Sequence, residues 1–90
     1  MKIVFAFNVK HEIPRDIEFD SPATIAVIAE TIRGLGHTVV EIEADNHAFV
    51  KLHDLAERKQ VDLVFNIAEG LGGDAREAQI PLFCEILKIP

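Results

Sequence analysis

Hydrophobic residues along the chain form short runs of two kinds. Apolar runs occupy residues 3–7, which are continuous, and residues 61–65, in which Asp62 is the one polar residue; their valine, isoleucine, leucine and phenylalanine content is typical of central strands covered on both faces. Residues 38–43 alternate instead, with Val40 and Ile42 each followed by a glutamate, which predicts a more exposed strand nearer the edge of a sheet. The pattern therefore predicts three strands, with the first and third in central positions.

Three segments repeat apolar residues at the spacing of an amphipathic helix. The first follows Ser21 and Pro22, a serine suited to cap a helix and a proline suited to its first turn. Asp45 or Asn46 can cap the second helix. The apolar stripes comprise, for the first helix, Ile25, Ile28, Ala29 and Ile32; for the second, Ala48, Phe49, Leu52, Leu55 and Ala56; and for the third, Ile80, Phe83, Cys84 and Leu87.

The third helix covers roughly residues 77–87. Pro81 fits only near the start of a helix, because further inside it would remove a hydrogen bond, so this helix cannot begin much earlier than Arg76. Ile89 and Pro90 resemble the first residues of a fourth strand.

The alternation of strands and helices predicts an α/β domain with three layers. Right-handed crossovers give an open, Rossmann-like parallel sheet with helices on both faces, strand order 2-1-3, and a fourth position beyond the third strand. In that order the chain changes direction between the first and third strands. The loops at 8–20 and 66–77, the longest and most charged in the chain, should therefore lie side by side at a ligand-binding crevice.

Composition narrows the classes of function. Ninety residues with 49% apolar content fit one small domain. The net charge of −6 argues against nucleic-acid binding, which needs a basic patch. No segment approaches the roughly 18 to 20 apolar residues of a membrane span, so we expect no membrane partner. A single cysteine, Cys84, favours a reducing, cytoplasmic setting and is interpreted as a small core residue.

The loop after the third strand, EGLGGDARE, combines glycines with charged side chains. Glycine lets backbone N–H groups approach an anion, but the sequence matches neither common phosphate-binding motif, and Glu69 and Asp74 would repel a phosphate. A plain flexible turn is the alternative. Arg76 and Glu77 either form a local ion pair or orient the carboxylate and amine of a substrate.

The loop after the first strand is acidic. Asp16, Glu18 and Asp20 alternate, so in an extended loop their carboxylates could receive an ammonium group or a hydrated cation; a solvated acidic loop is the alternative. We predict no metal site and no catalytic nucleophile in this chain. The histidines have no metal-ligand spacing and are interpreted as surface or packing residues: His11, His37, His47 and His53.

The run VFNIAEGLGGDAREAQIPLFCEILKIP resembles the end of the N-terminal domain of D-alanine–D-alanine ligases and their close relatives in the ATP-grasp superfamily. The segment FDSPATIAVIAETIRGLGHTVVEIEA looks like the first helix and second strand of the same domain. The likeness covers essentially the whole chain. The positions that carry it in the first run are Phe65, Glu69-Gly70, Gly73-Asp74, Gln79 and Ile89-Pro90.

The resemblance implies that residues 1–90 form a pre-ATP-grasp domain, which holds the first amino-acid substrate of a carboxylate–amine ligase. It implies that Glu18, or Asp16 nearby, receives the substrate's amino group, that Glu69 and Gly70 close the site, and that Arg76 and Glu77 shape the loop. It also implies ATP and Mg²⁺ for the full ligase, an acyl phosphate intermediate, and a place in peptidoglycan precursor synthesis. This chain itself would hold no cofactor.

The chain departs from the family pattern in two places. The GG-x-S-x-E signature after the first strand is replaced by FNVKHEIPRDIEF, and Glu69 stands where a histidine is typical. A related carboxylate–amine ligation therefore stays open beside D-alanine dipeptide formation. Because the 90 residues contain no ATP-grasp segment, we expect a domain of a longer protein whose uncovered packing surface favours a homodimer. The alternative is a stand-alone flavodoxin-like module that binds a small ligand or a protein without catalysis.

Overall fold

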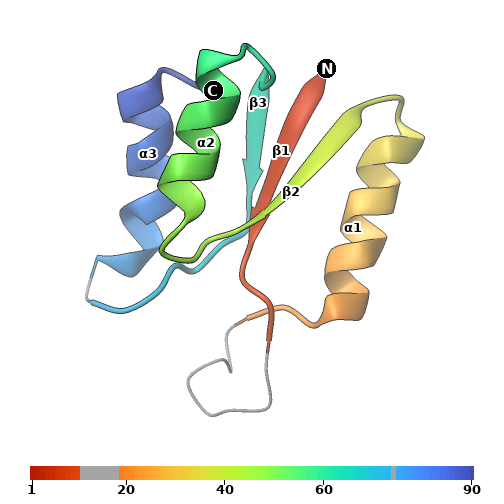
Figure 1. Cartoon of the computed structure of the whole chain (residues 1–90). Coiled ribbons are helices and arrows are strands. Elements are labelled where there is room, and N and C mark those ends of the chain that lie inside the picture. Colours follow the sequence, from red (N-terminus) through yellow and green to blue (C-terminus); the bar gives the residue numbers. More distant parts are fainter. Residues whose placement is uncertain (11–18, 74) are drawn as a thin grey trace.

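The apolar run near the start of the chain forms the middle strand of a parallel sheet (Figure 1). The strands are β1 (Lys2–Phe7), β2 (Thr38–Glu43) and β3 (Leu63–Asn66). Their order is β2-β1-β3 and all pairs are parallel, which confirms the predicted α/β fold and strand order. This computed structural model describes residues 1–10, 19–73 and 75–90.

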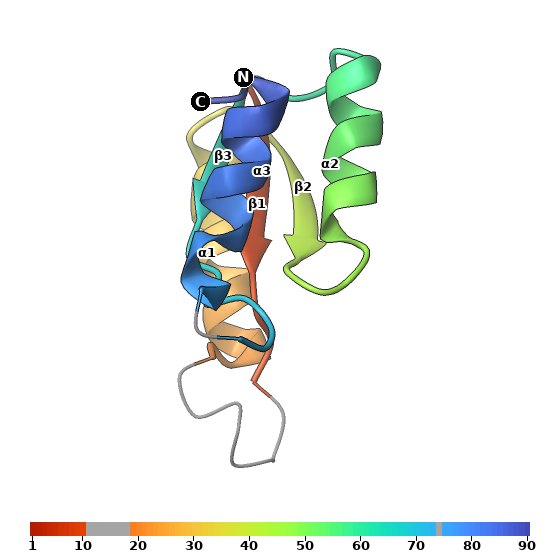
Figure 2. The ribbon, with the colours of Figure 1, turned by 90° about the vertical axis from the view of Figure 1, so that its left-hand side faces the viewer.

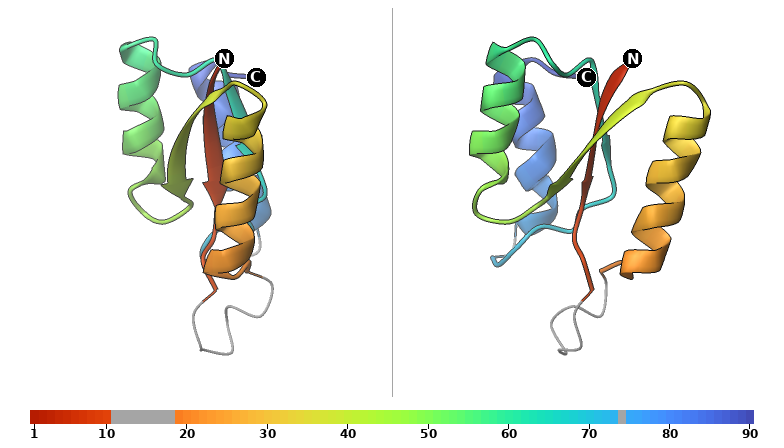
Figure 3. Two further views of the ribbon diagram at one scale, coloured as in Figure 1. Left: turned by 90° about the vertical axis from the view of Figure 1, so that its right-hand side faces the viewer. Right: turned by 45° about the vertical axis from the view of Figure 1, so that its right-hand side comes forward.

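Helices cover both faces of the sheet. The helical segments are α1 (Pro22–Gly34), α2 (Ala48–Glu57), the short 3-10 helix η2 (Arg76–Ala78) and α3 (Gln79–Leu87). Figure 3 shows α1 on one face, and Figure 2 shows α2 and α3 on the other. The N- and C-termini lie at one end of the sheet, opposite the carboxyl ends of the strands (Figure 1).

The alternation of side chains along β1 divides the core in two, because successive strand residues point to opposite faces. Val4 and Ala6 are buried in the cluster beneath α2 and α3. Phe5 and Phe7 are buried in the cluster beneath α1. Both faces of β1 are thus covered, as the continuous apolar run predicts.

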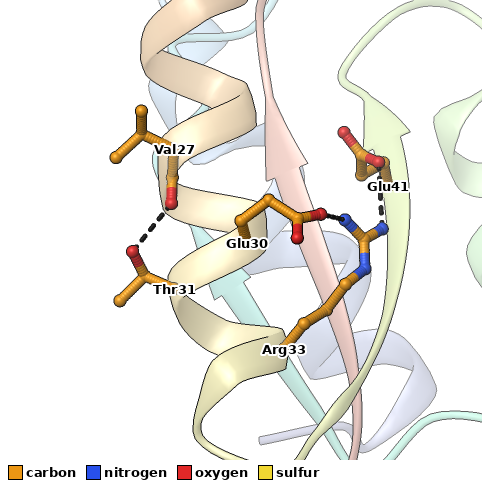
Figure 4. A network of polar contacts seen from close by, with 5 residues as sticks. All are labelled: Val27, Glu30, Thr31, Arg33 and Glu41. Carbon is orange, nitrogen blue, oxygen red and sulfur yellow. Dashed lines mark hydrogen bonds and ion pairs between the residues drawn. The ribbon is translucent and has the colours of Figure 1, made fainter.

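The start of α1 follows the sequence prediction closely. Ser21 Oγ accepts a hydrogen bond from Thr24 N at 3.2 Å, and Pro22 occupies the first turn. Near the other end of the helix, Arg33 donates to Glu30 at 2.7 Å and to Glu41 of β2 at 3.2 Å (Figure 4). The hydrogen bond to Glu30, followed by that to Glu41, raises the pKa of Arg33. The guanidinium therefore stays charged and links α1 to β2.

The predicted cap of α2 is wrong. The helix begins at Ala48 after His47, and no side chain makes the capping hydrogen bond. Asp45 instead accepts a hydrogen bond from His47 N at 2.8 Å, one step before the helix. The side chain of Asp45 is thus used to shape the turn between β2 and α2, while Asn46 is exposed.

The third strand is less buried than its sequence predicts. It begins at Leu63 rather than Val61, and it lies at an edge of the three-stranded sheet. Phe65 points toward the α1 face and is 45% exposed, because the described part of the chain has no second helix on that face. The prediction of a strand covered on both faces is therefore wrong for β3.

The end of the chain lies where a fourth strand was predicted. Lys88 has a φ of 58°, a left-handed conformation that ends α3. Val64 N then donates a hydrogen bond to Pro90 O at 2.8 Å, so Pro90 lies along the outer edge of β3. Of the helices in residues 1–10, 19–73 and 75–90, none has the length and apolar content needed to cross a membrane.

Candidate functional site

The segments that follow the three strands converge beyond the end of β1. Ile67 N donates to Ala6 O at 2.9 Å from the β3 side, and Ala44 N donates to Phe7 O at 2.8 Å from the β2 side. The chain leaving β1 is therefore flanked by the chains leaving both neighbouring strands. In parallel α/β sheets, this end is where ligands bind.

Asn8 joins these three segments. Its side chain is 1% exposed, and its Oδ1 accepts hydrogen bonds from Glu69 N at 2.9 Å and Gly70 N at 2.8 Å. On the other side, Nδ2 donates to Ala44 O at 3.2 Å. The start of the 8–20 loop thus contacts the 66–77 loop directly, as the strand order predicts.

The two ends of the loop after β1 also lie together. Asp20 N donates to Asn8 O at 3.2 Å, and Lys10 N donates to Asp20 O at 2.7 Å. The segments around Val9 and Asp20 run parallel at this point. Lys10 and Asp20 therefore bracket the loop next to the end of the sheet.

The loop after β3 has a conformation that requires glycine at position 70. Gly70 has a φ of +81°, and a Cβ atom there would collide with the backbone carbonyl of Arg76 and approach Oε1 of Gln79 to 2.7 Å. Gln79 binds Leu71 from two sides, accepting from Leu71 N at 3.1 Å and donating to Leu71 O at 2.9 Å. The loop is thus folded back onto the start of α3.

The predicted site residues of this loop are gathered within it. Glu69 and Arg76 are partly buried, Gly70 is buried, and Glu77 is exposed on η2. The close approach of backbone atoms brings Gly70 against Arg76, while Asn8 connects Glu69 and Gly70 to β1. Asp16, Glu18 and Asp74 lie outside the described residues.

Partly buried carboxyl residues surround this end of the sheet. Asp20 follows the loop after β1, Glu43 ends β2, and Glu69 lies in the loop after β3. Glu43 Oε2 accepts a hydrogen bond from Val9 N at 3.4 Å, which holds that carboxylate near the end of β1. Lys10 and Arg76 belong to the same two loops, so this end of the sheet carries charged side chains of both signs.

The glycine-rich loop does not present a phosphate cradle at its first three amides. The N–H groups of Glu69 and Gly70 are bound by Asn8, and that of Leu71 is bound by Gln79. A phosphate would have to displace these side chains to reach them. The geometry therefore supports the sequence argument against a phosphate site.

The described residues contain no close group of three or more His, Cys, Asp or Glu side chains that could hold a metal ion. Burial raises the pKa of the Cys84 thiol, which disfavours the reactive thiolate. Cys84 packs against the core beneath α2 and α3, in agreement with its predicted role as a small core residue.

A concave surface lies between α2 and β2. The residues that line it are Val40, Glu41, Ile42, Lys51, Asp54, Leu55 and Arg58. Arg58 donates a hydrogen bond to Asp54 at 2.7 Å, and Glu41 accepts one from Arg33. Most of the charged side chains that line this surface are therefore already paired. The loops at the carboxyl end of the sheet remain the better candidate site.

Sequence reasoning missed the roles of Asn8 and Gln79. Asn8 is the first polar residue after the buried run of β1, and this position, directly after a central strand, was the available signal. The role of Gln79 depends on the fold of a loop eight residues away, which the sequence pattern does not reveal.

Comparison with protein-family models, curated protein sequences and solved structures found no match to this chain.

Proposed function

We propose that this chain is the substrate-side domain of a cytoplasmic, ATP-dependent carboxylate–amine ligase and binds an amino acid at the carboxyl end of its sheet. One observation carries the proposal: Asn8 connects the end of β1 to Glu69 and Gly70, so the loops after the first and third strands meet. This is the position at which open α/β sheets bind ligands. The motif resemblance adds the class of ligand.

The charges at this end suit an α-amino acid. The ammonium group would bind acidic side chains through charge-assisted hydrogen bonds, with Glu69 contributing from the loop after β3. Glu18, or Asp16, would contribute from the loop after β1, an assignment based on the resemblance alone. Arg76 would bind the substrate carboxylate, and Glu77 would support the loop after β3. Gly70 lets the backbone of Arg76 approach closely within this loop.

ATP and Mg²⁺ would be held by ATP-grasp domains that act together with this one. In the loop after β3, the N–H groups of Glu69 and Gly70 are bound by Asn8 and that of Leu71 is bound by Gln79, so these amides are not open to a nucleotide phosphate. We assign this chain the binding and orientation of the amino acid.

Partner domains would pack on the side of the molecule formed by β3 and α3. Phe65 is 45% exposed, and Leu82 and Ile86 of α3 are 51% and 58% exposed. A helix that is apolar on nearly all sides is usually buried, and α3 has only Gln79 and Glu85 as polar residues. Without those domains, a homodimer would cover the same surface.

Amino-acid binding tests the proposal directly. Titration of the ¹⁵N-labelled protein with D-alanine and L-alanine should shift the amide signals of Glu69, Gly70 and Asp20. Propionate and ethylamine, which each lack one charged group, should bind more weakly. Absence of any shift at these amides with tens of millimolar amino acid would contradict the proposal.

A pair of glutamate variants assigns the ammonium-binding role. Glu69→Gln keeps the size of the side chain but removes its charge, and should weaken amino-acid binding about tenfold. Glu57→Gln, at the far end of α2, is the matched control and should leave binding unchanged. Equal affinities for the two variants would remove Glu69 from the site.

The ligase assignment needs a protein that contains this domain together with ATP-grasp domains. There, release of phosphate from ATP should depend on the amino acid and should fall in Glu69→Gln. Amino-acid binding by the domain combined with phosphate release that ignores the amino acid would favour a stand-alone binding module instead.

A further inference from the structure

Asn8 is the one buried polar side chain among the described residues, at 1% exposure. It lies immediately after β1, where the ladders to β2 and β3 end. Three backbone groups point at it: the N–H groups of Glu69 and Gly70 from one side and the carbonyl of Ala44 from the other. The side-chain amide therefore bridges the two chains that flank β1.

The chemistry of this position selects an amide. A carboxamide supplies an acceptor for two N–H groups and a donor for a carbonyl within one planar group. An apolar residue of similar volume would fill the space but leave three backbone groups without partners. Packing alone would favour such an apolar residue, so the hydrogen bonds explain why asparagine stands here.

We propose that Asn8 is a positioning residue, which fixes Glu69 and Gly70 before any ligand binds and so makes the loop after β3 a preformed wall of the site. Asn8 acts through the backbone of Glu69, whose carboxylate faces the ligand in the function proposed above. The effect on ligand binding rests on that proposed function. The fixing of the loop does not.

Gly70 and Gln79 support the same conclusion. Gly70 has a positive φ and packs closely against the backbone carbonyl of Arg76. Gln79, at the start of α3, makes two hydrogen bonds with the backbone of Leu71, the next residue. Residues 69–71 are thus held from two directions, whereas a Cβ atom at Gly72 or Gly73 would meet nothing within 4 Å.

Hydrogen exchange of the unliganded protein tests the fixing of the loop without any variant. The amides of Glu69 and Gly70 should exchange at least tenfold more slowly than those of Gly72 and Gly73. Exchange at Glu69 or Gly70 requires its hydrogen bond to Asn8 Oδ1 to break. Equal exchange at all four amides would overturn the proposal.

Two variants of Asn8 separate positioning from general stability. Asn8→Asp keeps the acceptor for both amides, and Asn8→Ala removes it. Relative to the amides of β1, protection at Glu69 and Gly70 should fall about tenfold in Asn8→Ala and much less in Asn8→Asp. Ile32→Val, a mild core change at the far end of α1, should lower all protection equally.

Measurement of amino-acid affinity in the same variants tests the effect of Asn8 on ligand binding. Asn8→Ala should weaken binding about tenfold, Asn8→Asp should largely restore it, and Ile32→Val should not change it. Protected amides in a protein that binds no amino acid would refute the proposed function but support the fixed loop. Normal affinity in Asn8→Ala, with its loop amides unprotected, would overturn the positioning role.

Discussion

Gly70 is the residue at which the site loop has least freedom. Its φ of +81° belongs to the left-handed region, where a residue with a side chain raises the free energy of the fold by about 1–2 kcal/mol. The space beside its Cα is also filled by the carbonyl of Arg76 and the side chain of Gln79. The sequence correctly marked this glycine as a loop residue, but only the packing of the loop shows that a side chain cannot fit.

A comparison of two glycines tests this packing. Gly70→Ala should destabilise the fold by about 2–4 kcal/mol, because backbone strain and collision add. Gly72→Ala, at a φ of +63° with open space around it, should cost only about 1–2 kcal/mol. Urea denaturation monitored by circular dichroism measures both. Equal losses would show that the collision is absent.

Cys84 gives a residue-scale prediction for pH. Burial raises the pKa of its thiol above the ordinary 9.0, so the fold favours the neutral thiol. This contribution to stability is complete below the pKa of the unfolded chain and is lost as pH rises through the higher pKa of the folded state. Iodoacetamide should therefore alkylate the native protein at pH 8.5 more slowly than the urea-unfolded chain. Equal rates would contradict the burial of Cys84.

At the scale of elements, local signals were reliable where local chemistry decides. Ser21 and Pro22 start α1 as predicted, and the alternation in residues 38–43 matches β2. The predicted cap of α2 was wrong because the Asp45 side chain accepts a hydrogen bond from His47 N in the turn before the helix. The predicted burial of β3 was wrong because an apolar run does not reveal how many helices cover each face of a strand.

Two cap variants distinguish the correct prediction from the wrong one. Ser21→Ala should cost about 1 kcal/mol, because the first turn of α1 loses the acceptor for Thr24 N. Asn46→Ala, at an exposed position before α2, should change the free energy of unfolding by less than about 0.5 kcal/mol. Thermal or urea unfolding gives both values, and a large loss in Asn46→Ala would restore asparagine as a cap.

At the scale of the whole molecule, strand order determined the candidate site more than any single motif did. The order β2-β1-β3 brings together loops that are about 60 residues apart in the chain, as the Asn8 to Glu69 hydrogen bond shows. That convergence could be predicted from the sequence. The role of Asn8 was missed because its position after a central strand does not identify its hydrogen-bond partners, which lie at least 36 residues away in the sequence.

Self-association is the prediction at this scale. The exposed apolar residues of β3 and α3 should make this chain associate at high concentration. Phe65→Ser and Ile86→Ser should reduce association, whereas Val27→Ser, which alters an even more exposed residue of α1, should not. Light scattering over a concentration series measures this. A strict monomer at every concentration would contradict the proposed packing surface.

We propose that the loops after β1 and β3 bind one amino acid between them. Intermolecular nuclear Overhauser effects from the methyl group of bound alanine test it most directly. We expect contacts to amides on both sides, at Val9 or Asp20 and at Glu69 or Gly70. Contacts confined to one loop, or located in the groove between α2 and β2, would contradict it.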